Sequence, residues 1–292
     1  MLITHRLEYS VYMLFVWIAR IIGYTRIKYL ARFISFLFFY LVPIRKKVVL
    51  NNLRIAFPEK SEIELKKIAR ENYYYFALSF LEIPLLFYFD KTSLLKLSDN
   101  KNIEIVKDGL KENKGLLLLT AHFGNWELGA LLVGIEINKE ISVLAKRQKN
   151  NFVADKMQLI REKFGNKEVL LGVSVRELYK TLRNGGAIGI VGDQRAPKKS
   201  GIIIKYFNRD TLVFAGAASL AVKLKSPIYL ILLPRLSNGN YQMVVERISY
   251  ENLPDENEAA VQELTQRYFN CLEKYVRQYP AQWLWMHKIW KN

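Results

Sequence analysis

Cysteine and histidine are scarce in this chain of 292 residues, and each scarcity excludes a class of site. Cys271 is the one cysteine, which excludes an internal disulfide framework and a cysteine-based structural zinc site. Histidine occurs only as His5, His122 and His287, with no H-E-x-x-H sequence, so we predict no metal site. The low cysteine content favours a reducing compartment that faces the cytoplasm.

Acidic residues are absent from position 9 to position 58, a stretch rich in Lys and Arg. The formal net charge of +17 would attract nucleic acid, an anionic membrane or an acidic carrier. Here the basic residues flank apolar runs at 9–19 and 33–44, and neither run reaches the roughly 20 residues of a simple membrane span. Basic and apolar residues in this mixture are typical of helices in a lipid interface. We therefore predict a helical membrane anchor at 1–44, with a buried helical hairpin as the alternative.

A cleaved secretory signal is a second alternative for the N-terminal segment. Arg20 closes the first apolar run, and no site of the A-x-A type follows it, so we expect the segment to be retained. The excess of positive residues beside the anchor favours a position on the cytoplasmic face of the membrane.

Strand-like and helix-like patterns alternate over the rest of the chain, 45–292, which we predict to be one catalytic domain. Patterns typical of strands fall at 115–120, 141–145, 169–171, 187–191, 202–207, 228–233 and 241–248. Helical patterns fall at 61–81, 125–133, 152–164, 174–183, 214–223 and 256–279. This alternation predicts an α/β fold whose central sheet is mixed, mostly parallel, and flanked by helices.

The sharpest local feature is the segment 120–127, Thr-Ala-His-Phe-Gly-Asn-Trp-Glu. His122 follows a predicted buried strand, at the end where open α/β sheets carry their sites. Glu127 would lie roughly 140° away from it on a continuous helix, but Gly124 permits a turn that brings the two together. We therefore expect Glu127 to hold one imidazole nitrogen and the other nitrogen to take a proton from an alcohol. A capped loop histidine is the alternative, and no G-x-S-x-G sequence supports a serine nucleophile.

Five segments, in order, resemble one family. The segment His122–Glu127 resembles the H-x4-D/E signature of glycerolipid and lysophospholipid acyltransferases, and the chain is most similar to the bacterial lipid A biosynthesis (lauroyl/myristoyl) branch. The other segments are a basic Asn-Leu…Phe-Pro stretch at 45–59, Lys-Arg-Gln-Lys-Asn at 146–150, Gly-Asp-Gln at 192–194, and Pro-x-x-Trp-x-Trp-x-His at 280–287. The resemblance extends over nearly the whole chain.

The resemblance implies a mechanism and a set of site residues. It implies that His122 is the general base, that Glu127 orients it, and that no acyl-enzyme forms. It also points to Arg147, Arg161 and Asp193 as substrate-binding residues, and we add Gln194, which continues the loop after Asp193. An arginine fork suits a phosphate of the lipid or of the donor, although Arg161, on a predicted helix, has a solvated surface position as its alternative. The acyl donor would be a thioester of acyl-carrier protein or coenzyme A, with no further cofactor.

The resemblance further implies an O-acyltransferase that acts on a lipid A precursor in lipopolysaccharide biosynthesis, at the cytoplasmic face of the cell inner membrane. Its expected partners are the donor, an anionic lipid acceptor and the membrane surface. A lysophospholipid, another glycolipid or an amino-acid lipid is the alternative acceptor, and a non-enzymatic basic membrane-binding protein is a third hypothesis. We expect no nucleic-acid binding, because the N-terminal basic residues interleave with apolar runs. Trp283, Trp285 and Trp290 form either a core-packing tail or an interfacial contact.

Overall fold

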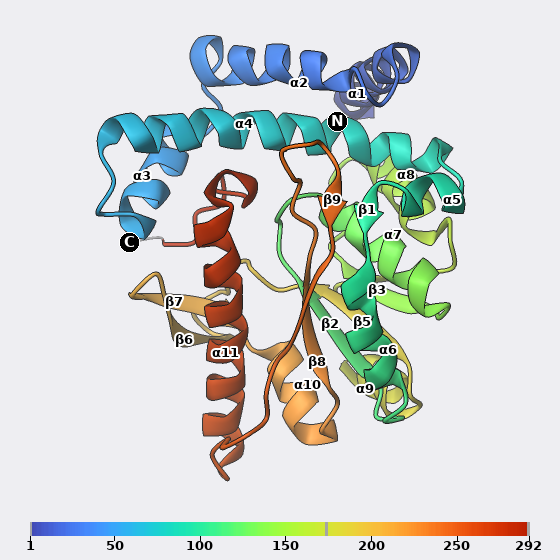
Figure 1. Ribbon diagram of the computed structural model, residues 1–292, viewed down its shortest axis with the longest axis vertical. Coiled ribbons are helices and arrows are strands. Elements are labelled where there is room, and N and C mark those ends of the chain that lie inside the picture. Colours follow the sequence, from blue (N-terminus) through green and yellow to red (C-terminus); the bar gives the residue numbers. More distant parts are fainter. Residues whose placement is uncertain (1, 173–174, 291–292) are drawn as a thin grey trace.

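A six-stranded sheet lies at the centre of the fold, in a computed structural model that describes residues 2–172 and 175–290 (Figure 1). Its strand order is β10-β8-β2-β5-β3-β4. The strands are β2 (Leu116–Thr120), β3 (Ile141–Ala145), β4 (Lys167–Leu170), β5 (Ala187–Val191), β8 (Ile228–Leu232) and β10 (Val244–Arg247). Only β10 is antiparallel to its neighbour, so the predicted mixed, mostly parallel sheet is confirmed.

Helices cover both faces of this sheet because its strands are apolar on both sides. Leu117 and Leu119 of β2 belong to one core cluster, and Leu116 and Leu118 belong to the other. The first face packs against α9 (Val175–Arg183), α10 (Gly216–Leu224) and α11 (Asn257–Gln278). The second packs against α6 (Glu104–Leu110), α7 (Trp126–Ile137) and α8 (Asn151–Glu162), with α5 (Lys91–Leu95) beside α7.

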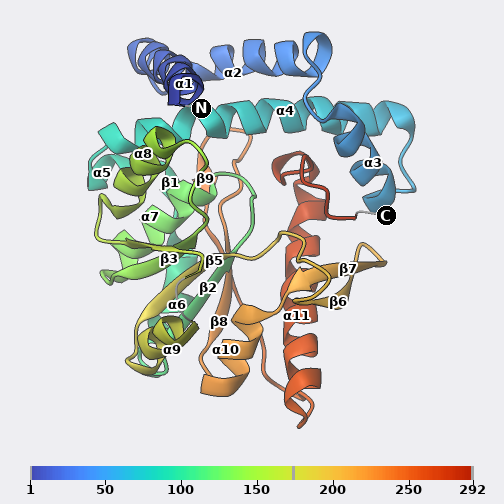
Figure 2. The ribbon, with the colours of Figure 1, turned by 180° about the vertical axis from the view of Figure 1, so that it is seen from behind.

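A separate helical layer lies across one end of the molecule, as Figure 2 shows from behind. The helix α4 (Glu62–Leu85) runs beneath α1 (Leu2–Ile22) and α2 (Ile27–Phe36), and α2 continues into the π-helical turn η1 (Leu37–Leu41). Small and branched residues of α1 and α2 pack on the alanine and leucine residues of α4. The helix α3 (Lys46–Ala56) then leads into α4, so the predicted boundary near position 44 falls in the connection after η1.

The N-terminal helices expose the side that faces away from α4. None of the described helices is by itself long and apolar enough to cross a bilayer. Together, Ile27–Leu41 and Lys46–Ala56 meet that requirement, with a bend of 93° between them. The exposed side carries large apolar side chains, namely Leu7, Val11, Leu14, Trp17 and Ile21 of α1 and Tyr29, Phe33 and Phe36 of α2.

Two parts of the strand pattern were wrong in detail. The segment at 202–207 is not in the central sheet, because β6 (Gly201–Tyr206) forms a hairpin with β7 (Arg209–Phe214), a strand that the sequence analysis missed. The segment at 241–248 divides into β9 (Tyr241–Gln242), which pairs with β1 (Ser98–Asp99), and β10.

The helix at 61–81 extends four residues further, and Pro84 lies in its last turn, followed by η2 (Leu86–Tyr88). Position 174, the first of the helix predicted at 174–183, lies outside the described residues.

Candidate active site

The loop between β2 and α7 carries His122 and has little conformational freedom. Gly124 has a φ of +57°, and a Cβ at this position would lie 2.0 Å from the carbonyl oxygen of Leu233. Only glycine fits there, because the backbone of the adjacent segment at Leu233 leaves no room for a side chain. Asn125 caps α7, with its Oδ1 accepting a hydrogen bond of 3.1 Å from the amide of Leu128. The histidine therefore precedes the helix, as predicted.

Asp193 is the carboxylate that holds the imidazole. Its Oδ1 lies 2.8 Å from Nδ1 of His122, and its Oδ2 accepts from the His122 amide at 2.9 Å. The indole Nε1 of Trp283 donates to the same Oδ2 at 2.8 Å. The residues meet because β2 and β5 are adjacent and parallel, with Thr120 opposite Val191, so His122 and Asp193 both follow the carboxyl ends of neighbouring strands.

The charges of this pair are coupled. Burial alone would lower the pKa of His122, but the charge and hydrogen bond of Asp193 outweigh it, and the pKa is raised above the ordinary histidine value. Burial alone would raise the pKa of Asp193, which is 3% exposed, but His122 and the indole hold it below the usual aspartate range. The carboxylate is therefore ionised and can stabilise an imidazolium.

Glu127 does not contact the imidazole, which corrects the geometric expectation from the sequence. Its carboxylate accepts two bonds from Arg161 of α8, from Nε at 2.9 Å and from Nη2 at 2.6 Å. The third guanidinium nitrogen, Nη1, donates to Glu168 at 2.6 Å. Glu127 lies in the first turn of α7, and its side chain binds Arg161 of α8 in the bidentate geometry that arginine favours.

Arg161 is correspondingly not the solvated residue of the alternative interpretation. Its side chain is 14% exposed and touches two carboxylates. Burial alone would lower its pKa, but the hydrogen bonds and charges of Glu127 and Glu168 raise it well above the arginine value. The guanidinium is therefore engaged within the protein.

A cavity of about 480 Å³ opens beside His122. His122, Trp126 and Glu127 line it together with apolar residues of four strands and α7. The apolar walls include Leu118, Val133, Ile141, Val143, Ile190 and Ile231. Basic residues at the end of β3, Lys146, Arg147 and Lys149, are exposed and line the same cavity. The space thus combines an apolar interior with cationic groups, a combination that suits a fatty chain linked to an anionic group.

The two remaining predicted site residues also line this cavity. Gln194 lies next to His122, with its Nε2 3.5 Å from the histidine Nε2. Arg147 donates to Asp155 at 2.9 Å and to Asn151 at 3.4 Å, and its side chain is 43% exposed. Five of the six predicted residues therefore line one cavity, and the sixth, Asp193, is buried and hydrogen-bonded to the histidine.

The C-terminal tail is a part of the site that the sequence analysis missed. Trp283 forms a β-bridge with Phe123, and the amide of Leu284 donates to the carbonyl of His122 at 3.0 Å. Asn72 of α4 donates to the carbonyls of Ala281 and Trp283 at 2.9 and 2.6 Å. Trp283, Trp285 and Trp290 are all buried, so the core-packing interpretation of the tail is confirmed. The sequence feature that could have indicated this role is Trp283, because the N–H of a buried indole requires an acceptor, which here is Asp193.

Comparisons with known proteins identify a family that this chain resembles over its whole length. The family model of the bacterial lipid A biosynthesis acyltransferase matches residues 1–292. The lipid A biosynthesis lauroyltransferase of Escherichia coli (strain K12) is 23% identical over 251 residues, which are 85% of this chain and 79% of the relative. The lipid A biosynthesis palmitoleoyltransferase of the same strain is 22% identical over 252 residues, with the same coverage. A lipid A biosynthesis acyltransferase of Haemophilus influenzae (strain ATCC 51907 / DSM 11121 / KW20 / Rd) is 23% identical over 252 residues, which are 85% of this chain and 78% of the relative.

These matches define the protein as an acyltransferase, and its architecture is α/β. Its reaction accordingly transfers an acyl group from a donor to a lipid acceptor and releases the carrier of the donor. The chain belongs to the bacterial lipid A biosynthesis acyltransferase family.

Proposed function

We propose that this protein is a membrane-associated O-acyltransferase that transfers a fatty acyl chain from a thioester to a hydroxyl of a lipid A precursor. The observation that carries the proposal is the orientation of His122. Its Nδ1 is bound to Asp193, and its ring lines the apolar cavity. The printed names of the relatives supply the acceptor, lipid A, because they are lipid A acyltransferases.

The proposed chemistry begins with proton removal. When Nδ1 donates to Asp193, Nε2 has the free lone pair and takes the proton of the acceptor hydroxyl. The hydroxyl oxygen attacks the thioester carbonyl and forms a tetrahedral intermediate. This intermediate collapses with cleavage of the carbon–sulfur bond, and the leaving thiolate takes the proton back from Nε2. Asp193 stabilises the imidazolium between the two transfers, as the aspartate of a Ser-His-Asp triad does.

Glu127 has a different role in this proposal from direct orientation of the histidine. Its charge raises the pKa of His122 after the larger effect of Asp193, while Arg161 opposes it. Its two bonds to Arg161 join the first turn of α7 to α8, and both helices adjoin the cavity. We therefore assign Glu127 to fixing the wall of the site and to a through-space effect on the base. Arg161 then holds Glu127 and Glu168 instead of a substrate phosphate.

The cavity is assigned to the acyl chain of the donor, because apolar walls stabilise a fatty chain by about 0.8 kcal/mol per buried methylene group. Lys146, Arg147 and Lys149 at the end of β3 are placed to meet phosphate groups of acyl-carrier protein or coenzyme A. Gln194, beside Nε2 of His122, is assigned to contact with the reacting groups. No further cofactor is part of the proposal.

The outer helices α1 and α2 are assigned to the membrane surface. Leu14 and Trp17 of α1 and Phe33 of α2 are at least half exposed, which is costly in water. The same segment has no acidic residue between positions 9 and 58, so its charge is complementary to anionic lipid. We propose attachment at the cytoplasmic face of the inner membrane, with the apolar side chains in the interface.

Replacement of His122 by Ala tests the proposal. The purified variant should lose acyl transfer by at least about 10³-fold and keep the fold, because the base is removed. The matched control is His5→Ala, in α1, which should retain activity in detergent. The assay offers acyl-carrier-protein and coenzyme A thioesters with lipid A precursor or lysophospholipid, and identifies products by mass spectrometry. Undiminished transfer by His122→Ala would refute the mechanism, and a lysophospholipid product alone would refute the acceptor.

A further inference from the structure

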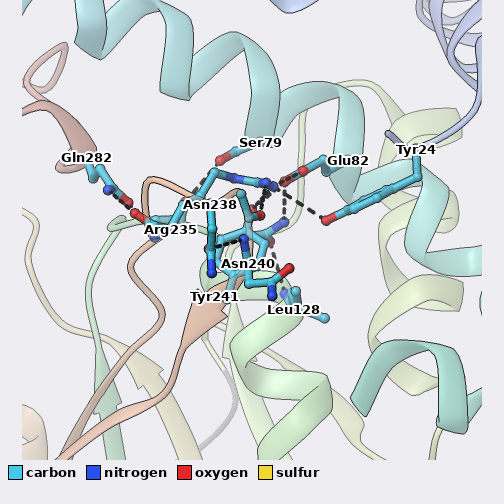
Figure 3. Close-up of polar contacts among 12 residues, drawn as sticks. Tyr24, Ser79, Glu82, Leu128, Arg235, Asn238, Asn240, Tyr241 and Gln282 are labelled. Carbon is cyan, nitrogen blue, oxygen red and sulfur yellow. Dashed lines mark hydrogen bonds and ion pairs between the residues drawn. The ribbon is translucent and has the colours of Figure 1, made fainter. Parts of the chain in front are cut away.

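A buried ion pair lies beside the His122 loop and takes no part in the proposed chemistry (Figure 3). Glu82 of α4 is 1% exposed, and its carboxylate accepts from Nη2 of Arg235 and from the hydroxyl of Tyr241. The Arg235 guanidinium also contacts the Tyr241 hydroxyl at 2.6 Å and stacks 4.3 Å from the centre of its ring. At the edge, the Tyr24 hydroxyl lies 3.4 Å from Nη2.

Such a pair is not explained by stability alone. Removing two charges from water costs several kcal/mol for each ion, and apolar residues of similar volume often fill such a site equally well. Glu82, Arg235 and Tyr241 line neither of the two described cavities that border His122. The polar contacts of the pair lead instead to the loop that carries His122.

Asn125 connects the pair to the loop. Its Nδ2 donates to Oε2 of Glu82 at 3.2 Å, and its Oδ1 accepts from the amide of Leu128. An ionised carboxylate only accepts hydrogen bonds, so Glu82 allows just one orientation of the Asn125 amide. In that orientation the oxygen faces the helix and caps α7. Asn125 is completely buried, which removes water as a substitute partner.

The ion pair also reaches the loop backbone through a wider cluster, which consists of Glu82, Arg235 and Tyr241 with their neighbours Gln282 and Ser79. Arg235 and Gln282 exchange two hydrogen bonds of 2.8 Å, from the Arg235 amide to Oε1 and from Nε2 to the Arg235 carbonyl. The carbonyl of Gln282 then accepts from the Gly124 amide at 3.0 Å. Ser79, three residues before Glu82 on α4, donates to the Gly124 carbonyl at 3.0 Å. Both peptide groups of Gly124 are thus held by residues of this cluster.

We propose that Glu82 and Arg235 are positioning residues for catalysis, which fix the Asn125 amide and through it the loop that presents His122. The inference rests on the proposed role of His122. Because these residues do not touch the cavity, their loss should lower kcat and leave KM nearly unchanged.

A reciprocal exchange tests the proposal. Asn125→Asp keeps a helix cap but places two carboxylates together, and Glu82→Gln removes the charge that orients Asn125. Each single variant should lose about tenfold or more in kcat. In the double variant Glu82→Gln/Asn125→Asp, the new glutamine donates to the new aspartate, which still caps Leu128 and leaves one negative charge near Arg235. Most of the lost kcat should return.

Tyr24→Phe is the matched control, because it removes only the 3.4 Å contact at the edge of the cluster. Its kcat should equal that of the wild type. Full kcat in both single variants would overturn the proposal, as would a double variant no better than the worse single one.

Hydrogen–deuterium exchange of the peptide 121–131 gives a readout without activity. The single variants should exchange faster there than the wild type, and the double variant should recover protection. This readout decides the positioning of the loop even if the wild type transfers no acyl group to lipid A, in which case only the proposed function fails. Unchanged exchange in both single variants would overturn the inference by itself.

Discussion

Replacement of Asp193 by Asn should reverse the tautomer of His122. Oδ2 of Asp193 accepts from two N–H groups, the His122 amide and the Trp283 indole. An asparagine must place its oxygen at this position, because its NH2 group cannot accept. Its NH2 then occupies the place of Oδ1 and donates to Nδ1 of His122. The proton of the neutral imidazole moves to Nε2, the nitrogen that the mechanism needs free.

The size of the effect follows from the lost interaction. A hydrogen bond to a charged group contributes about 1.5–3 kcal/mol, which corresponds to roughly one to two pKa units. The carboxylate now raises the pKa of His122, so the variant pKa should fall by at least that amount. A general base acts when neutral, so activity in the wild type falls as the pH decreases through the raised pKa. In the variant this limb moves to lower pH, and the plateau falls by about 10³–10⁴-fold, as in a triad with the wrong tautomer.

Nitrogen-15 NMR of the imidazoles measures both the tautomer and the pKa of His122. The signals can be assigned because the chain has only three histidines. Asp155→Asn is the matched control, because Asp155 is an exposed partner of Arg147. Glu127→Gln should lower the pKa of His122 by less, because Glu127 acts only through space. An unchanged His122 pKa in Asp193→Asn, together with a large fall in Glu127→Gln, would refute the assignment of Asp193.

Two further predictions concern the cavity and the outer helices. Val133→Phe adds volume inside the cavity of about 480 Å³, so mass spectrometry of the products should show shorter acyl chains than in the wild type; an unchanged chain length would contradict the acyl assignment. Leu14→Glu and Phe33→Glu should each weaken binding to anionic vesicles by about tenfold or more in a sedimentation assay, whereas Ile63→Glu, at an exposed position of α4, should not. Equal binding of all variants at every salt concentration would exclude the proposed surface.

The central fold could be predicted because its strands are short, apolar and separated by amphipathic helices. The strands at 141–145 and 187–191 have the predicted bounds. The hairpin of β6 and β7 could not be predicted, because the second strand, Arg-Asp-Thr-Leu-Val-Phe, begins with polar residues and has only weak alternation. Membership of the central sheet is also a tertiary property, since a strand pattern does not specify the neighbour with which the strand pairs.

The position of His122 could be predicted, but its partner could not. The sequence offered Glu127 because it is near in the chain, whereas the structure supplies Asp193, 71 residues away, through the adjacency of β2 and β5. Strand order decides which loops meet, and no local pattern contains it. Asp193 entered the candidate list only through the resemblance, as a substrate contact. The family resemblance thus identified Asp193 as a site residue, and the structure shows that it contacts His122.

The two carboxylates near His122 differ in what surrounds them, and this difference separates their roles. Asp193 is contacted by the imidazole Nδ1, a backbone amide and an indole. Within residues 2–172 and 175–290, the cation that bonds to it is therefore the imidazolium. Glu127 is bound to Arg161, whose positive charge opposes the effect of Glu127 on the pKa of the histidine. A carboxylate that is already bound to a permanent cation is a poor stabiliser of a proton that appears only during the reaction. An ionised aspartate that is hydrogen-bonded to the imidazole itself gains most of its interaction energy at that moment. Loss of Glu127 should therefore act mainly through the contact between α7 and α8 and the shape of the cavity, with a smaller effect on the pKa of His122, while loss of Asp193 acts on the base.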